Sequence, residues 1–180
     1  MFILYMLLLK YKKNHVMGSL NNKKQLVIIL FIVVAAMFRL MPHFPNVTPI
    51  TAMALFSGVY LTNKKLAFII PILAMLISDL FLGFSSITLF VYAAFILVSY
   101  IGISSKKVSI KTILLSSIGF FIITNFGVWL FGYPKTLNGL MECYTLAIPF
   151  FRNSLIGDFF YAGVMYYGFE FISNRYLKTA

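Results

Sequence analysis

Two apolar segments of this chain are joined by the stretch RLMPHFPNVTPITAMALFSG, residues 39–58. The junction is broken by prolines and contains Arg39, His43 and Asn46. Such side chains and such irregular backbone are costly in lipid unless they face protein or water. The stretch therefore predicts a polar region, enclosed by protein or open to water, at one end of a pair of membrane helices.

The composition predicts an integral membrane protein with a single domain. Of the 180 residues, 61% are hydrophobic, 18% are aromatic and four are acidic, and the mean hydropathy is +0.94. These values are too apolar for a soluble domain of this size. The net charge of +11 lies mostly in short lysine clusters between apolar runs, as membrane-topology signals do. The sequence thus predicts a lipid bilayer, and no nucleic acid, as partner.

At roughly 20 residues per span, the chain is predicted to be an all-α membrane protein with six transmembrane helices. Their predicted bounds are about 25–41, 48–62, 66–83, 86–103, 109–131 and 152–172. In this topology twelve Lys and Arg residues lie on one side, and only Arg39, Lys135 and Arg152 lie toward the other. By the positive-inside rule, we expect a multi-pass protein of the cell (inner) membrane with both termini in the cytoplasm.

The predicted membrane domain covers residues 25–172, between a cytoplasmic N-terminal segment, 1–24, and a cytoplasmic tail, 173–180. Residues 1–9 are apolar but too few to span, and they lack the basic start and the cleavage site of a signal peptide. The true start is therefore open between Met1 and Met17.

Four predicted helices carry a polar residue 14 to 17 positions from the basic residue at their cytoplasmic end. The pairs are Lys24 with Arg39, Lys65 with Asp79, Lys111 with Asn125, and Arg175 with Asp158. A helix rises about 1.5 Å per residue, so these polar groups are expected at one level, roughly 21–26 Å from the cytoplasmic end. That level lies in the outer part of a hydrocarbon core about 30 Å thick.

Helix N-termini are expected to face the same level. Thr48 is predicted to cap the second helix, with Pro49 in its first turn, and the fourth and sixth helices are predicted to begin near Ser85 and Arg152. Three positive dipole ends favour an anionic or carboxylate-bearing ligand, while Asp79 and Asp158 are available for a cationic group.

The segment 133–151 is predicted to form an outer interfacial helix or lid before the last span, because it is apolar but too interrupted to cross. Trp129, Tyr133 and Tyr144 suit the membrane interface. In the second helix, Ala54 and Gly58 form a small-residue pair of the kind that lets two helices approach closely.

The candidate substrate-binding residues are polar groups expected at the outer level. They are Arg39, Asn46, Asp79, Asn125, Arg152, Asn153 and Asp158, with His43, Trp129 and Glu142 as secondary candidates. Arg39 with Asp79, and Arg152 with Asp158, are predicted ion pairs, and they could equally serve only to hold the bundle together. Asn125 could bind a ligand or make an interhelical hydrogen bond. For the secondary candidates a plain loop or interfacial position is the alternative.

The sequence contains no recognisable catalytic motif: there is no nucleophile with its base, no carboxylate pair on one helix and no cluster with metal-ligand spacing. We therefore predict no catalytic residue, cofactor or metal. An intramembrane enzyme remains an alternative that would require His43 or Glu142 to meet Asp79 or Asp158.

Three segments carry a resemblance to known proteins: residues 46–58, Ile77 to Asp79, and Ala147 to Asp158. Here the chain resembles a family of small, uncharacterised bacterial integral-membrane proteins, over about residues 25–172. More distantly it looks like the S components, the substrate-binding subunits of energy-coupling factor transporters. That resemblance implies a six-helix fold, capture of a small solute from outside, and partnership with a transmembrane coupling subunit and two ATPases. The first helix departs from that family, because Val33 to Phe38 lacks the Ala-x-x-x-Ala spacing of its coupling surface.

The leading hypothesis is an S-component-like membrane protein that binds a small polar solute, anionic or zwitterionic, in an outer cavity. A second is an accessory or assembly protein whose polar residues only lock the helices together. These two differ in whether a ligand-sized space exists among the polar groups.

Overall fold

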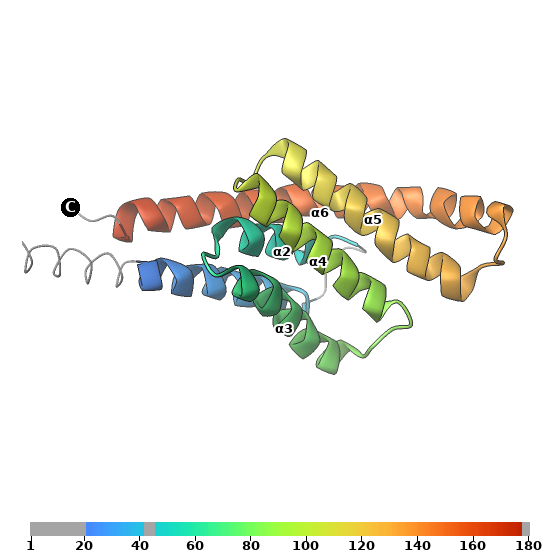
Figure 1. The fold of residues 1–180 in the computed structure, drawn as a ribbon, viewed down its shortest axis with the longest axis horizontal. Helices are drawn as coiled ribbons and strands as arrows, with labels where there is room; N and C mark the ends of the chain where they lie inside the picture. Colours follow the sequence, from blue (N-terminus) through green and yellow to red (C-terminus); the bar gives the residue numbers. More distant parts are fainter. Residues whose placement is uncertain (1–20, 42–45, 178–180) are drawn as a thin grey trace, which may run out of the picture.

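The computed structural model describes residues 21–41 and 46–177, and these form an all-α fold (Figure 1). An N-terminal helix, Asn21–Phe38, is followed by α2, Ile50–Tyr60, and α3, Lys64–Leu82. The chain continues through α4, Thr88–Ser105, α5, Ile110–Gly132, and α6, Leu137–Tyr176. The start of the N-terminal helix and the end of α6 lie at the same end of the molecule (Figure 1).

Four of these six helices are long and apolar enough to cross a membrane: the N-terminal helix, α3, α4 and α5. Helix α2 has 11 residues and is about 16 Å long, roughly half the thickness of a hydrocarbon core. The structure thus supports apolar membrane-like helices without establishing the predicted count of six spans.

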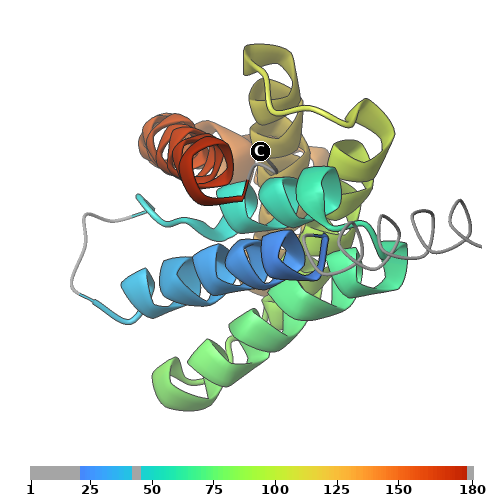
Figure 2. The same ribbon diagram turned by 90° about the vertical axis from the view of Figure 1, so that its left-hand side faces the viewer.

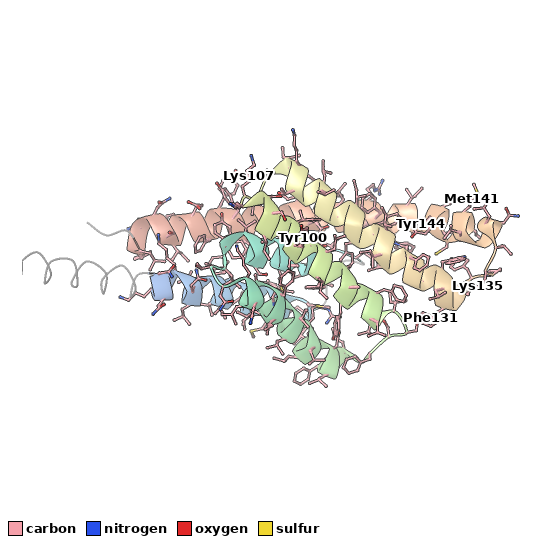
Figure 3. The ribbon with its side chains drawn as sticks, in the orientation of Figure 1. Tyr100, Lys107, Phe131, Lys135, Met141 and Tyr144 are labelled. Atoms are coloured by element: carbon pink, nitrogen blue, oxygen red, sulfur yellow. The ribbon has the colours of Figure 1, made fainter. Side chains whose placement is uncertain are left out.

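Lys107 and Lys135 lie at the α4–α5 and α5–α6 connections, respectively (Figure 3).

Polar side chains begin three of the long helices. Asn63 accepts from the backbone N–H groups of Lys65 and Leu66 at the start of α3, and Ser109 forms a capping box with Thr112 at the start of α5. Thr136 accepts from Gly139 N–H at 3.1 Å at the start of α6. These bonds satisfy N–H groups that have no partner within the helix.

Helix α2 forms the centre of the bundle. Every residue from Thr51 to Gly58 is buried, and the helix contacts α3, α4, α5 and α6 (Figure 2). A helix that is apolar on all sides is stable only when it is enclosed in this way. Its far end is packed by aromatic rings, with Phe56 and Tyr60 against Phe169 at centroid distances of 5.7 and 4.7 Å.

The predicted close helix approach at Gly58 is confirmed, and its partner is Gly102 of α4. A Cβ added to Gly58 would lie 2.2 Å from the Ser99 carbonyl oxygen, and one added to Gly102 would lie 2.6 Å from that of Leu55. The two backbones are therefore in direct contact at a crossing that only glycine permits.

Helix α4 begins at Thr88, within a few residues of its predicted start, but two other predictions about helix ends are wrong. Helix α2 begins after Pro49 with no side-chain cap, so Thr48 does not cap it. The segment 133–151 is not a separate interfacial helix, because α6 runs without a break from Leu137 through Pro149 to Tyr176. An internal proline removes one backbone hydrogen bond, and here the helix continues past it.

Candidate functional site

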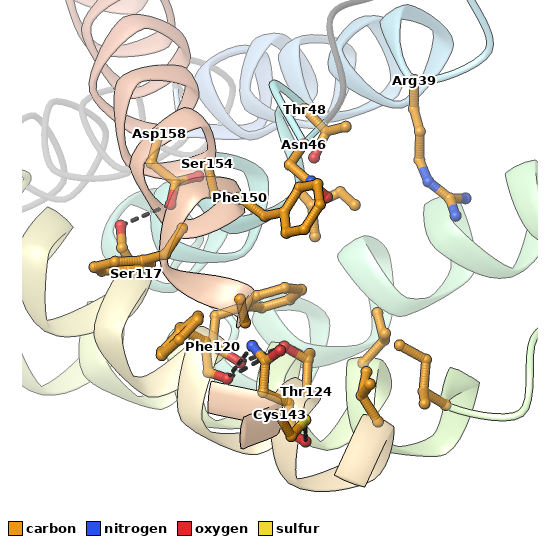
Figure 4. A pocket seen from close by; sticks show the side chains of 18 of the residues that line it. Arg39, Asn46, Thr48, Ser117, Phe120, Thr124, Cys143, Phe150, Ser154 and Asp158 are labelled. Carbon is orange, nitrogen blue, oxygen red and sulfur yellow. Dashed lines mark hydrogen bonds between the residues drawn. The ribbon is translucent and has the colours of Figure 1, made fainter. Parts of the chain in front are cut away.

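A cavity of about 950 Å³ opens among the helices (Figure 4). Its lining includes Leu82, Ile87 and Tyr133, at the ends of α3, α4 and α5 that lie away from the described chain ends (Figure 1). It is enclosed by residues 39–41 just after the N-terminal helix, residues 46–50, the end of α3, the start of α4, residues 117–128 of α5 and residues 143–158 of α6. Its polar lining consists of Arg39, Asn46, Thr48, Ser117, Thr124, Asn125, Tyr133, Ser154 and Asp158. The lining on α5 reaches from Ser117 to Val128, about 16 Å along the helix.

The aromatic part of the lining comes from α5 and α6. Phe120 and Phe121 belong to α5, and Phe150 and Phe151 belong to α6. The rings of Phe121 and Phe151 approach to 4.6 Å between centroids. An apolar lining with a few convergent polar groups is the usual composition of a small-molecule site.

Asp158 lies on α6 and is 3% exposed. Ser117 of α5 donates its hydroxyl to the carboxylate at 2.6 Å, and the Thr51 side chain of α2 interacts with the same group. Within residues 21–41 and 46–177, no basic side chain forms a salt bridge with Asp158. A buried carboxyl group held only by hydroxyls keeps its own charge uncompensated unless a cation or a proton reaches it.

Arg39 lies on the opposite side of the cavity from Asp158 (Figure 4). Its guanidinium Nη1 is 2.6 Å from Asp79 Oδ1 and also donates to the Ser78 hydroxyl. Tyr92 of α4 donates to the other carboxylate oxygen of Asp79 at 2.8 Å. The predicted Arg39–Asp79 ion pair is confirmed, and it ties the end of the N-terminal helix to α3 and α4.

Asn125 and Thr124 supply hydrogen-bonding groups on α5. The Asn125 amide nitrogen donates to the Phe121 carbonyl at 2.8 Å, and the Thr124 hydroxyl donates to that of Phe120. Among the described residues, the Asn125 amide oxygen makes no hydrogen bond. It is an acceptor on the cavity wall that a ligand can use.

Residues 46–48 lie against α6 beside Asp158. Asn46 has φ of 63°, in the left-handed region that Asn tolerates better than most residues. A Cβ added to Gly157 would lie 3.1 Å from the Val47 Cα and 3.4 Å from Thr48 N. The lack of a side chain at Gly157 therefore allows this backbone to form one wall of the cavity.

Four predicted residues line the cavity together: Arg39, Asn46, Asn125 and Asp158. Asp79 lies behind Arg39, and His43 falls outside the described residues. The remaining candidates do not line it. They are Arg152 and Glu142, both exposed, Asn153, half-buried, and Trp129, which donates to the Pro134 carbonyl at 3.0 Å.

The predicted Arg152–Asp158 ion pair does not form. Both residues belong to α6, and six positions along a helix turn them to different faces. Arg152 is exposed, whereas Asp158 faces the bundle. For the same reason the predicted helix start at residues 152–154 is wrong: the N-terminus of α6 lies 15 residues earlier, at Leu137.

The prediction of one common level is also wrong for Asp158. This residue contacts Ser117, which precedes Asn125 by eight positions, or about 12 Å along α5. Helix α6 extends past the start of α5 toward the end where the described chain begins and ends (Figure 1). Arg175 therefore does not mark the same plane as Lys111, and Asp158 lies deeper than its distance from Arg175 suggests.

The cavity also contains polar residues that sequence reasoning did not select: Ser117, Thr124, Cys143 and Ser154. A periodic signal was present in the sequence. On α5 the lining recurs at positions 117, 120, 121, 124, 125 and 128, and on α6 at 143, 146, 147, 150, 151, 154 and 158. Both series follow the spacing of one helix face, and the second continues across Pro149.

The length and apolarity of four helices are consistent with a helical integral membrane protein, in which the polar cavity lies between the helices. Within that class, the chain belongs to DUF6580, a family of unknown function whose model matches residues 19–179. No curated protein and no solved structure matches the chain.

Proposed function

We propose that this protein is a membrane binding protein that captures a small polar solute from the outer side. The observation that carries the proposal is the cavity of about 950 Å³, whose lining combines four phenylalanines with separate polar groups. Its volume is in the range of about 300–1,000 Å³ that is usual for ligand pockets. An accessory protein with purely structural polar residues would instead be expected to fill this space with side-chain pairs.

The outward direction rests on charge. Twelve of the fifteen Lys and Arg residues belong to the side assigned to the cytoplasm, and Lys135 belongs to the α5–α6 connection near the cavity end. The positive-inside rule then places the termini in the cytoplasm and the cavity mouth outside. In the same proposal, delivery of the solute uses a coupling subunit with ATPases, as in the S components that the sequence distantly resembles.

The test is native mass spectrometry of the protein in lipid nanodiscs, with a variant that fills the cavity. Thr124→Phe introduces a ring into the lining, while the control Ile122→Phe adds the same ring at a position that is 50% exposed on the outer surface of α5. We expect a co-purified solute with wild type and with Ile122→Phe, and its loss with Thr124→Phe. A solute that remains bound to Thr124→Phe, or wild type without any solute, would contradict the proposal.

A further inference from the structure

We infer that the solute carries an ammonium group and that this group pairs with Asp158, an inference that rests on the proposed function. Asp158 is 3% exposed, lines the cavity and has no basic partner in the described parts of the chain. A fixed acid at a buried cavity wall is matched best by a mobile cation.

The second acid of the site is already neutralised. Asp79 Oδ1 pairs with Arg39, and Asp79 Oδ2 accepts from Tyr92. Arg39 in turn has its charge matched by Asp79, so the pair adds no net charge to the cavity. The charge balance of the lining is therefore set by Asp158, and it favours a cation over an anion.

The surroundings of Asp158 also suit an ammonium group. Ser117 of α5 donates to the carboxylate and the Thr51 side chain of α2 also interacts with it, which leaves the group oriented before a ligand arrives. The phenylalanine rings of the lining offer faces that attract alkylammonium groups. The free amide oxygen of Asn125, about 12 Å farther along α5 than Ser117, is an acceptor for another part of the solute. The guanidinium N–H groups of Arg39 that Asp79 does not use can donate to the anionic end of a zwitterionic solute.

Three probes of one size separate charge from shape: 2-phenylethylammonium, 2-phenylethanol and phenylacetate. Binding to the full-length protein in nanodiscs is measured by isothermal titration calorimetry. We expect the ammonium probe to bind at least tenfold more tightly than the alcohol, and phenylacetate to bind most weakly. In Asp158→Asn, which keeps the size of the side chain, the preference for ammonium over alcohol should disappear.

Ser117→Ala is the second variant, because it removes a hydroxyl donor and retains the carboxylate. The preference for ammonium should persist in it, so the inference can be tested even if Asp158→Asn fails to fold. Equal binding of ammonium and alcohol by wild type, as expected of a protonated Asp158, would overturn the inference. So would an undiminished ammonium preference in Asp158→Asn. If a solute co-purifies but carries no cationic group, this inference fails while the proposed function stands. If no solute co-purifies and none of the probes binds, both fail.

Discussion

Gly58→Ala tests the central packing contact of the fold. The new Cβ would lie 2.2 Å from the Ser99 carbonyl oxygen, whereas ordinary carbon–oxygen contacts begin near about 3.3 Å. Helices α2 and α4 must therefore separate by about 1 Å, because a backbone oxygen cannot rotate away as a side chain can.

Overpacking of this kind costs about 1–3 kcal/mol, and the backbone contact places Gly58→Ala near the upper value. The replacement of a helical glycine by alanine by itself stabilises the helix by about 0.5–1 kcal/mol. We therefore expect the free energy of unfolding to fall by about 2 kcal/mol in total. For a chain of this length that corresponds to a decrease in Tm of about 4–8 °C. Solute binding should weaken as well, since α2 also carries Thr51, whose side chain interacts with Asp158.

The assay is thermal unfolding in detergent micelles, followed by circular dichroism. Gly163→Ala is the matched control: it makes the same substitution inside α6, where an added Cβ would meet nothing within 4 Å. Its Tm should stay the same or rise. If Gly58→Ala and Gly163→Ala had the same Tm, the close crossing of α2 and α4 would be refuted.

Three further predictions concern the ion pair, a helix cap and the continuity of α6. Arg39→Met should destabilise the protein by about 3 kcal/mol by leaving Asp79 buried without its cation, and adding Asp79→Asn should recover part of that loss in unfolding titrations. If Asp79→Asn instead caused a further loss of stability that added to the loss caused by Arg39→Met, the pairing of the two residues would be contradicted. Ser109→Ala should cost about 1 kcal/mol in the same assay, because it removes the capping box of α5, and an unchanged stability would argue against the cap. Spin labels at Met141 and Val164, in a cysteine-free background, should be about 35 Å apart if α6 is one helix, as 23 residues rise 1.5 Å each. A much shorter distance, measured by electron paramagnetic resonance, would show instead that the segment 133–151 is separate from the last helix.

Local features of the sequence predicted much of the fold. Apolar runs located the long helices to within a few residues, and Gly58 marked a close helix contact. The Arg39–Asp79 pair followed from two charged residues at similar distances from their basic anchors. These predictions needed only spacing along single helices and the rarity of charge in apolar segments.

The remaining features depend on how the helices are placed against one another. The depth of Asp158 could not be read from its distance to Arg175, because α6 is offset along the bundle relative to α5. Pro149 suggested a break, yet whether a proline ends a helix depends on its tertiary surroundings. The apolar composition around α2 predicted a full span, whereas the helix itself has 11 residues, and its neighbours enclose it.

The central claim, a solute cavity open to the outer side, is tested most directly by labelling a cysteine within it. Ser154 lines the cavity one turn from Asp158, and the natural Cys143 can be replaced by alanine. Membrane-impermeant methanethiosulfonate reagents added to intact cells should modify Ser154→Cys, and Thr124→Phe should slow the reaction. The lipid-facing control Ile156→Cys, 60% exposed on the outer surface of α6, should not react. Modification of Ser154→Cys only after the cells are permeabilised, or at the same rate in the presence of Thr124→Phe, would contradict the account.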